Sequence, residues 1–211
     1  MLLEAIQLAC SYSDIPLFEN INLKIGPGEA LRVCGENGSG KTSLLRILCG
    51  LTKPIEGIVK WNGQDIRDAN YEFNQGLIYI GHANALKGDL TACENILFGS
   101  ALTGDVVSIK EAYRVLHLVG LSTVADYPIK ILSQGQCKRV AQAKLRLPEM
   151  RSLWILDEPF TALDKRAVTD LIDVMNNHLK NGGMLIYTTH QEIELIAQHS
   201  LVLNIDSASI C

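Results

Sequence analysis

One eight-residue segment, at 35–42, constrains this chain more than any other feature of its sequence. It matches the phosphate-binding pattern G-x-x-x-x-G-K-[ST]. An apolar run at 30–34 precedes it and leucines at helical spacing follow it within 41–51, so the segment joins a predicted strand to a predicted helix. A glycine-rich turn that matched by chance would not require those neighbours. We therefore predict that nucleotide phosphates are bound by Gly35, Glu36, Asn37, Gly38, Ser39, Gly40, Lys41, Thr42 and the adjacent Ser43.

The residue types in this loop suit that task. Glycines allow backbone N–H groups to turn toward the phosphates, and the start of the helix adds the positive end of its dipole. Lys41 would counter the charge of the outer phosphates, and the Thr42 hydroxyl would hold Mg²⁺. The loop alone leaves kinases, GTPases, helicases and transporter ATPases open.

Apolar periodicity predicts an α/β fold. Strands are predicted at 2–8, 21–25, 30–34, 57–61, 76–80, 153–156, 184–188 and 201–205. Helical spacing predominates between 90 and 147, and further helices are predicted at 41–51, 164–179 and 192–197. Strands that alternate with helices predict a parallel core sheet covered by helices.

Composition excludes several classes of protein. The 19 Lys and Arg against 23 Asp and Glu give a net charge of −4, which argues against a nucleic-acid partner. No apolar run approaches the roughly 20 residues that span a bilayer, and the first ten residues lack the basic start of a secretory signal. Six cysteines form no CxxC pair, so neither a zinc site nor a redox motif is predicted. We expect a cytosolic protein.

Two adjacent acids end the predicted strand at 153–156. Successive side chains of an extended chain diverge, so Asp157 and Glu158 can serve different tasks. Asp157 is placed to bind the Mg²⁺ shell with Thr42, and Glu158 to polarise the water that attacks the outer phosphate. Without the phosphate loop, a solvated acidic turn would be the better explanation of this pair.

A histidine follows the next predicted strand at 184–188. His190 would lie at the carboxyl edge of the core sheet, where open α/β sheets bind their ligands. A lone histidine is more often structural. At the same edge as Glu158, however, it is predicted to sense the outer phosphate or to orient the attacking water.

With these pieces the chain resembles the ABC transporter ATPases. The segment 132–136 reads LSQGQ, like the family's LSGGQ, and 162–164 reads ALD, like its D-loop. The resemblance covers nearly the whole chain. It implies one domain at 1–211, with a RecA-like P-loop NTPase core and an N-terminal antiparallel β-subdomain at 1–83 and 151–211, and an inserted helical lobe at 84–150.

The resemblance also implies further site residues and partners. Two copies would pair head to tail, so that each ATP lies between the phosphate loop of one copy and Ser133, Gln134, Gly135 and Gln136 of the other. Asp164 would contribute at this interface, and the dimer would act beneath integral membrane subunits. Tyr12 lies where the family stacks an aromatic ring on adenine, although a tyrosine in the core would fit as well.

Two departures from the family pattern narrow the choice. Gln134 stands at the third position of the LSGGQ segment, where the family has glycine. His82 stands where the family usually has a glutamine that couples nucleotide state to the membrane subunits and helps to hold Mg²⁺. With the GH pair at 81–82 the chain looks like the haem-exporter ATP-binding subunits of bacterial cytochrome c maturation. That resemblance implies a peripheral protein at the cytoplasmic face of the inner membrane, which drives haem delivery to a periplasmic haem chaperone or its release.

Two alternatives remain open at this point. An ABC exporter ATPase for a lipid, drug or lipoprotein would share the same ATPase chemistry. A soluble ABC protein acting on ribosomes or nucleic acid would generally carry two cassettes or a long coiled coil, and this chain has neither.

Overall fold

The computed structural model describes residues 1–13, 15–147 and 151–210. The chain divides into two compact units. The first unit comprises Met1–Tyr79, Arg151–Pro159 and Met175–Cys211, and the second comprises Ile80–Met150 and Phe160–Val174. Each unit is described by itself below.

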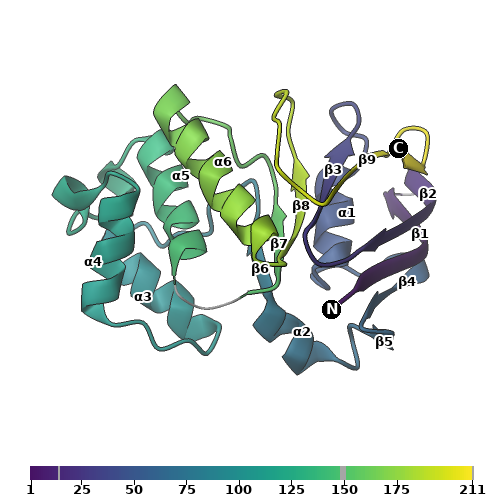
Figure 1. The fold of residues 1–211 in the computed structure, drawn as a ribbon, viewed down its shortest axis with the longest axis horizontal. Coiled ribbons are helices and arrows are strands. Elements are labelled where there is room, and N and C mark those ends of the chain that lie inside the picture. Colours follow the sequence, from purple (N-terminus) through teal and green to yellow (C-terminus); the bar gives the residue numbers. More distant parts are fainter. Residues whose placement is uncertain (14, 148–150, 211) are drawn as a thin grey trace. The chain divides into compact units, whose positions relative to one another are not determined.

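An antiparallel sheet forms the N-terminal part of the first unit (Figure 1), with strand order β2-β1-β4-β5. Its strands are β1 (Leu3–Tyr12), β2 (Ile15–Ile25), β4 (Glu56–Trp61) and β5 (Gln64–Asp65). The register of β1 against both neighbours shifts near Gln7, which has a φ of 50°. A Cβ on Gly57 would lie 2.4 Å from the Gln7 carbonyl oxygen, so this bulge requires a glycine opposite it.

The second sheet of this unit has the order β10-β9-β3-β8-β7-β6. Its strands are β3 (Glu29–Cys34), β6 (Leu77–Ile80), β7 (Leu153–Leu156), β8 (Met184–Thr188), β9 (His199–Asn204) and β10 (Ser209–Ile210). β3 runs parallel to β8 and β9, and β7 runs parallel to β8. Every residue of β7 and β8 is buried, as expected for central strands covered on both faces. Their carboxyl ends therefore meet at one edge of the sheet.

Helices α1 (Lys41–Leu48) and α2 (Asn70–Gly76) also belong to the first unit. The apolar residues of α1 at helical spacing are the ones it buries, namely Leu44, Leu45, Ile47 and Leu48. This burial fixes the start of α1 directly after β3 and the glycine-rich loop.

The second unit is helical. It contains α3 (Ala92–Leu102), α4 (Ile109–Leu118) and α5 (Gln134–Ala143), which lie side by side in Figure 1. Short 3-10 turns occur at Ser122–Val124, Ile129–Ile131 and Lys144–Arg146. A separate apolar core, which includes Ala112, Val115, Leu116 and Val140, holds the three helices together. Helix α6 (Lys165–Lys180) begins in this unit and ends in the first.

The predicted α/β fold, with a parallel core sheet, an antiparallel N-terminal sheet and a helical insertion, is confirmed. The helix predicted at 192–197 is wrong. These residues are irregular, with half-buried and exposed side chains in alternation. The Ile196 N–H donates to Asn176 Oδ1 and the Gln198 N–H to the Gly28 carbonyl, so their partners lie outside the segment. Six residues are too few to offset the cost of helix nucleation.

Across the described residues, none of the helices combines the length and the apolar character needed to cross a bilayer.

Candidate phosphate-binding and hydrolytic site

The glycine-rich loop links the end of β3 to the start of α1, as predicted. Gly40 caps α1 with a φ of 98°, a backbone conformation that favours glycine. A Cβ on Gly35 would lie 2.6 Å from Ser39 Oγ, so the loop closes on itself only because that position lacks a side chain. Ser39 Oγ is buried and has no hydrogen-bond partner among the described residues. A buried hydroxyl of this kind is available to a bound ligand.

Lys41 folds back over the loop. Its Nζ donates to the carbonyl oxygens of Gly35 and Glu36, each at 2.7 Å. The Glu36 N–H donates to Asp206 Oδ2 at 3.1 Å, which fixes the outer part of the loop. These contacts hold an ammonium group at the start of α1, where the helix dipole also favours an anion.

Asp157 lies at the carboxyl end of β7 and is 2% exposed. Its Oδ2 accepts from Thr42 Oγ1 at 2.7 Å, and its Oδ1 accepts from Thr188 Oγ1 at 2.8 Å. Burial, followed by the charge of Asp157, raises the pKa of Tyr79 to about 12. The same two causes raise the pKa of the Cys49 thiol far above its usual range. Asp157 therefore places a buried negative charge beside the Thr42 hydroxyl.

Glu158 adopts a strained backbone conformation, with a φ of 47° in a residue that is not glycine. Its N–H donates to Thr188 Oγ1 at 2.8 Å, and this bond holds the turn after β7. Its Oε1 is buried without a hydrogen-bond partner in the described part of the chain, and it lies 3.5 Å from His190 Nε2. The His190 side chain is 59% exposed. The carboxylate can therefore accept a proton from a ligand beside it.

Thr188 is a site residue that the sequence reasoning missed. It is completely buried at the last position of β8 and connects the Asp157 carboxylate to the Glu158 backbone. A polar side chain at the end of an otherwise apolar buried strand was the signal for it. Asp206, which holds the Glu36 N–H, was also missed, and nothing in its sequence context marks it.

Tyr12 ends β1 and is 73% exposed, so it does not belong to the core. Whether it contacts adenine stays a prediction. The structure therefore brings the loop, Asp157, Glu158 and His190 together within the first unit, with Tyr12 on the same unit's antiparallel sheet.

The other predicted site residues lie in the second unit. Ser133 caps α5: its Oγ accepts from the Gln136 N–H at 3.2 Å, and Gln136 Oε1 accepts from the Ser133 N–H at 2.8 Å. Ser133 and Gln134 are exposed, whereas Gly135 is half-buried. A Cβ on Gly135 would lie 2.7 Å from the Ala162 carbonyl oxygen, so the close approach at this point needs glycine.

Asp164 and His82 are exposed in the second unit. Asp164 Oδ1 accepts from the Ala167 N–H at 2.8 Å, the bond of a residue that caps a helix, and α6 begins at the next position. His82 lies in an irregular segment directly after β6. Its proposed role in coupling or Mg²⁺ binding stays a prediction.

Comparison with known proteins agrees with this geometry. The family model described as ABC transporter matches residues 18–161. The cytochrome c biogenesis ATP-binding export protein CcmA of Aromatoleum aromaticum is 48% identical over 191 residues, which cover 90% of this chain and 89% of that protein. The protein of the same name from Nitrosomonas europaea is 43% identical over 205 residues, covering 96% of each chain.

Solved structures show the same fold. A dimeric ATP-binding cassette in a post-hydrolysis state, bound to ADP and phosphate, has a TM-score of 0.79 at 25% identity and covers 90% of this chain and 88% of its own. The family model spans more than half of the chain, and the relatives exceed the identity and coverage that mark members of one family. This chain belongs to the ABC transporter family, in the group of the cytochrome c biogenesis ATP-binding export proteins.

Proposed function

We propose that this chain hydrolyses ATP to power an export step of cytochrome c biogenesis, with Glu158 as the general base. The observation that carries this proposal is the buried Glu158 Oε1, which has no hydrogen-bond partner among the described residues and lies 3.5 Å from His190 Nε2. A carboxylate left without a donor at the active edge of the sheet can accept a proton from the attacking water. His190 would orient that water or contact the outer phosphate.

The residues present fit Mg²⁺. The Thr42 hydroxyl and the Asp157 carboxylate are hard oxygen ligands 2.7 Å apart. The negative charge of Asp157 also contributes to the raised pKa values of Cys49 and Tyr79. When bound, Mg²⁺ would neutralise charge that develops on the phosphate oxygens. Lys41 and the loop amides would bind the phosphates, and Tyr12 would stack on the base.

We propose that the working form is a head-to-tail dimer of two such domains, each spanning 1–211. Ser133, Gln134, Gly135, Gln136 and Asp164 would meet the ATP held by the other copy's phosphate loop. The exposure of Ser133 and Gln134 supports this assignment, because the Ser133 hydroxyl can donate its proton to a ligand while its oxygen accepts from the Gln136 N–H. The dimeric state of a structural relative supports it as well.

The relatives are export proteins of cytochrome c biogenesis, which supports membrane partners and a haem-related cargo. We propose that the dimer binds integral membrane subunits at the cytoplasmic face of the bacterial inner membrane, and that it drives either the delivery of haem to a periplasmic haem chaperone or the release of that chaperone. His82 would take the place of the glutamine that couples nucleotide state to the membrane subunits. An exporter ATPase for another cargo is the alternative, because the ATP site does not read the cargo.

A complementation experiment tests the proposal. In a bacterium that lacks its own cytochrome c biogenesis ATPase, the wild-type chain should restore covalently bound haem in c-type cytochromes, and the Glu158→Gln chain should not. An exposed acid in the same unit supplies the control, since Glu192→Gln should complement fully. If the wild-type chain hydrolyses ATP and yet restores no cytochrome when co-expressed with its own membrane subunits, the cargo assignment is wrong.

A further inference from the structure

In the helical unit, the buried side chain of Asn95 holds a loop that is also bonded to the segment before Ser133. Residues 85–91 lead from the His82 segment into α3, and Asn95 on the first turn of α3 holds them. Asn95 is 6% exposed. Its Oδ1 accepts from the Lys87 N–H at 2.7 Å, and its Nδ2 donates to the carbonyl oxygens of Lys87, Leu90 and Thr91 at 2.9 to 3.2 Å.

The backbone of residues 87–91 thus satisfies both the oxygen and the nitrogen of the Asn95 side-chain amide. A buried amide that lost these partners would carry the full desolvation cost of its donors and acceptor. Leu86 packs against the core of the helical unit and Lys87 Nζ lies 5.9 Å from the centre of the Phe98 ring, so the loop is also held by its side chains. In the described part of the chain, no comparable hydrogen bonds hold the residues before it, from 81 to 85.

The same loop is bonded to the segment that precedes Ser133. The Lys130 N–H donates to the Gly88 carbonyl and the Ile129 N–H to the Leu90 carbonyl, each at 3.0 Å. Thr91 and Pro128 form an isolated antiparallel bridge. Lys130 Nζ lies 2.9 Å from Asp89 Oδ1, although both side chains are largely exposed and this pair contributes little.

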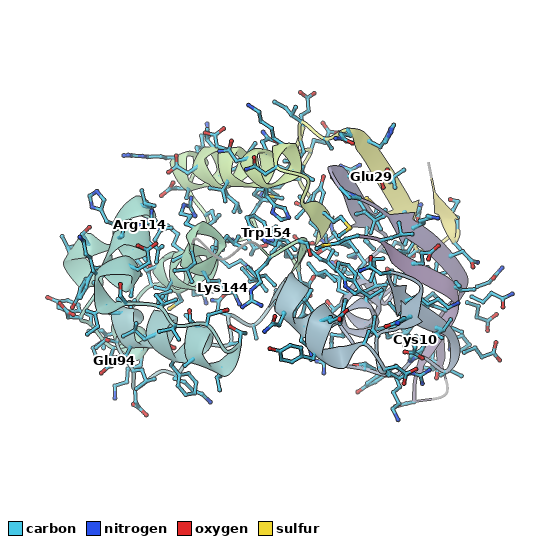
Figure 2. All side chains as sticks on the ribbon, turned by 60° about the horizontal axis from the view of Figure 1, so that its bottom comes forward. Cys10, Glu29, Glu94, Arg114, Lys144 and Trp154 are labelled. Carbon is cyan, nitrogen blue, oxygen red and sulfur yellow. The ribbon has the colours of Figure 1, made fainter. Side chains whose placement is uncertain are left out.

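These bonds end only three residues before Ser133. The Leu132 N–H donates to the Ile129 carbonyl oxygen at 3.0 Å, and Ser133, the next residue, caps α5 with its hydroxyl. Glu94, which is labelled in Figure 2, closes the capping box at Thr91 and stiffens the junction further.

We propose that Asn95 is a positioning residue that makes 86–91 and 128–132 one rigid strap, which sets the position of Ser133 at the start of α5. The inference rests on the proposed function for its use, because that function makes Ser133 the group offered to the other copy's ATP. The strap itself is a property of one chain and can be measured without ATP turnover. Its effect would be that the two segments move together.

Amide hydrogen exchange on the full chain tests the strap directly. Asn95→Asp keeps an acceptor for the Lys87 N–H but turns the Nδ2 donor into an acceptor that faces three carbonyl oxygens. We expect exchange in peptides covering 84–91 and 128–134 to accelerate at least about tenfold together, as sub-global opening of one cooperative unit. Peptides covering the phosphate loop should not change. Asn177→Asp, the same chemical change at an exposed position of α6, is the matched control.

The proposal is overturned if amide exchange accelerates in only one of the two segments, 84–91 or 128–134, or if it accelerates in neither. If Asn95→Asp instead unfolds the whole helical unit, a disulfide takes over as the test. A Cβ on Gly88 would lie 3.8 Å from Lys130 Cβ, close to the mean separation in disulfides. The pair Gly88→Cys and Lys130→Cys is best built with Cys137→Ala, because the Cys137 thiol lies 3.7 Å from the Ile129 carbonyl oxygen.

The oxidised pair should retain ATP turnover within about twofold of its reduced form, because segments that already move as one body lose nothing when they are locked. It should also restore exchange protection to Asn95→Asp where that variant folds. Turnover that falls at least about tenfold on oxidation and returns on reduction would mean that the segments must separate, which overturns the proposal. If the wild-type chain shows no turnover at all, the proposed function fails, and the exchange experiment still decides on the strap.

Discussion

The phosphate loop and the Ser133 segment hold their functional groups in opposite ways. The loop lies between two buried elements, and the acid beside it is bonded to two hydroxyl groups while it is almost fully buried. Ser133 and Gln134 are exposed at a helix start that one capping box stabilises. The first region is preorganised for a ligand within its own chain, whereas the second presents its groups outward.

This contrast accounts for the departure from the family pattern at Gln134. Glycine is retained at Gly35, Gly40 and Gly135, where an added Cβ would collide or φ is positive. Gln134 lies at an exposed position at the start of α5, where a side chain has room. Exposed positions tolerate substitution that strained or closely approached positions do not.

The largest effect should come from the buried region. Glu158→Gln removes the carboxylate that accepts the proton, and we expect ATP turnover to fall at least about a hundredfold while ATP binding is kept. Phosphate release and nucleotide binding on the purified protein measure the two. Turnover within about threefold of wild type would show that Glu158 is not the base.

The exposed region should respond differently. Ser133→Ala removes a hydroxyl donor to the outer phosphate, a hydrogen bond to a charged group, and should lower turnover by about ten- to a hundredfold. It also removes a helix cap, at a cost of about 1 kcal/mol in the free energy of unfolding. Ser108→Ala is the control for the loss of a helix cap, because Ser108 Oγ caps α4 by accepting from the Glu111 N–H at 3.1 Å.

Both serine variants should therefore unfold at similar denaturant concentrations, while only Ser133→Ala loses turnover. If both variants lose turnover equally, Ser133 acts only as a helix cap and not as a donor to the phosphate.

The stability of the first unit should depend on pH through His178. Its ring stacks on Trp154 with centroids 3.8 Å apart (Trp154 is labelled in Figure 2), and burial lowers the pKa of His178 to about 4. A histidine whose pKa is lower in the folded than in the unfolded chain stabilises the fold fully above about pH 6.5. That stability is lost as pH falls from 6.5 through 4.

We expect a loss on the order of 2 kcal/mol in the free energy of unfolding between pH 7 and pH 5 from this residue. Denaturant unfolding followed by tryptophan fluorescence measures it. His178→Phe keeps a stacked ring without a titrating group and should abolish this part of the pH dependence. An unchanged slope in that variant would assign the dependence to other groups.

The smallest effect concerns Tyr12. Tyr12→Leu removes a ring but keeps apolar bulk, and loss of stacking worth about 1 kcal/mol should raise KM for ATP about fivefold with kcat unchanged. Tyr71→Leu, a similarly exposed tyrosine of the same unit, is the control. Identical KM values for wild type and Tyr12→Leu would leave Tyr12 without a role in base binding.

The sequence predicted the phosphate loop and the strand before Asp157 because the signals for these elements are local. The motif at 35–42 and the strand before Asp157 lie in continuous segments whose neighbours confirm them. Thr188 and Asp206 contribute through hydrogen bonds across 31 and 170 positions of chain, respectively, and such contacts leave no periodic trace. The bonds between 86–91 and 128–132 escaped prediction for the same reason.

The helix predicted at 192–197 failed on a related point. Its apolar residues fit helical spacing, but the backbone finds partners in Asn176 and Gly28, which only the folded chain brings near. Tertiary hydrogen bonds outweighed a weak local preference.

Mixing two inactive variants tests most directly the claim that one copy offers Ser133 to the ATP of the other. In a head-to-tail dimer of Glu158→Gln with Ser133→Ala, one site carries both changes and the other carries neither. Equal amounts of the two variants should recover about a quarter of wild-type turnover, because half of the dimers are mixed and each has one intact site. Turnover of the mixture that stays at the level of the separate variants would contradict this account.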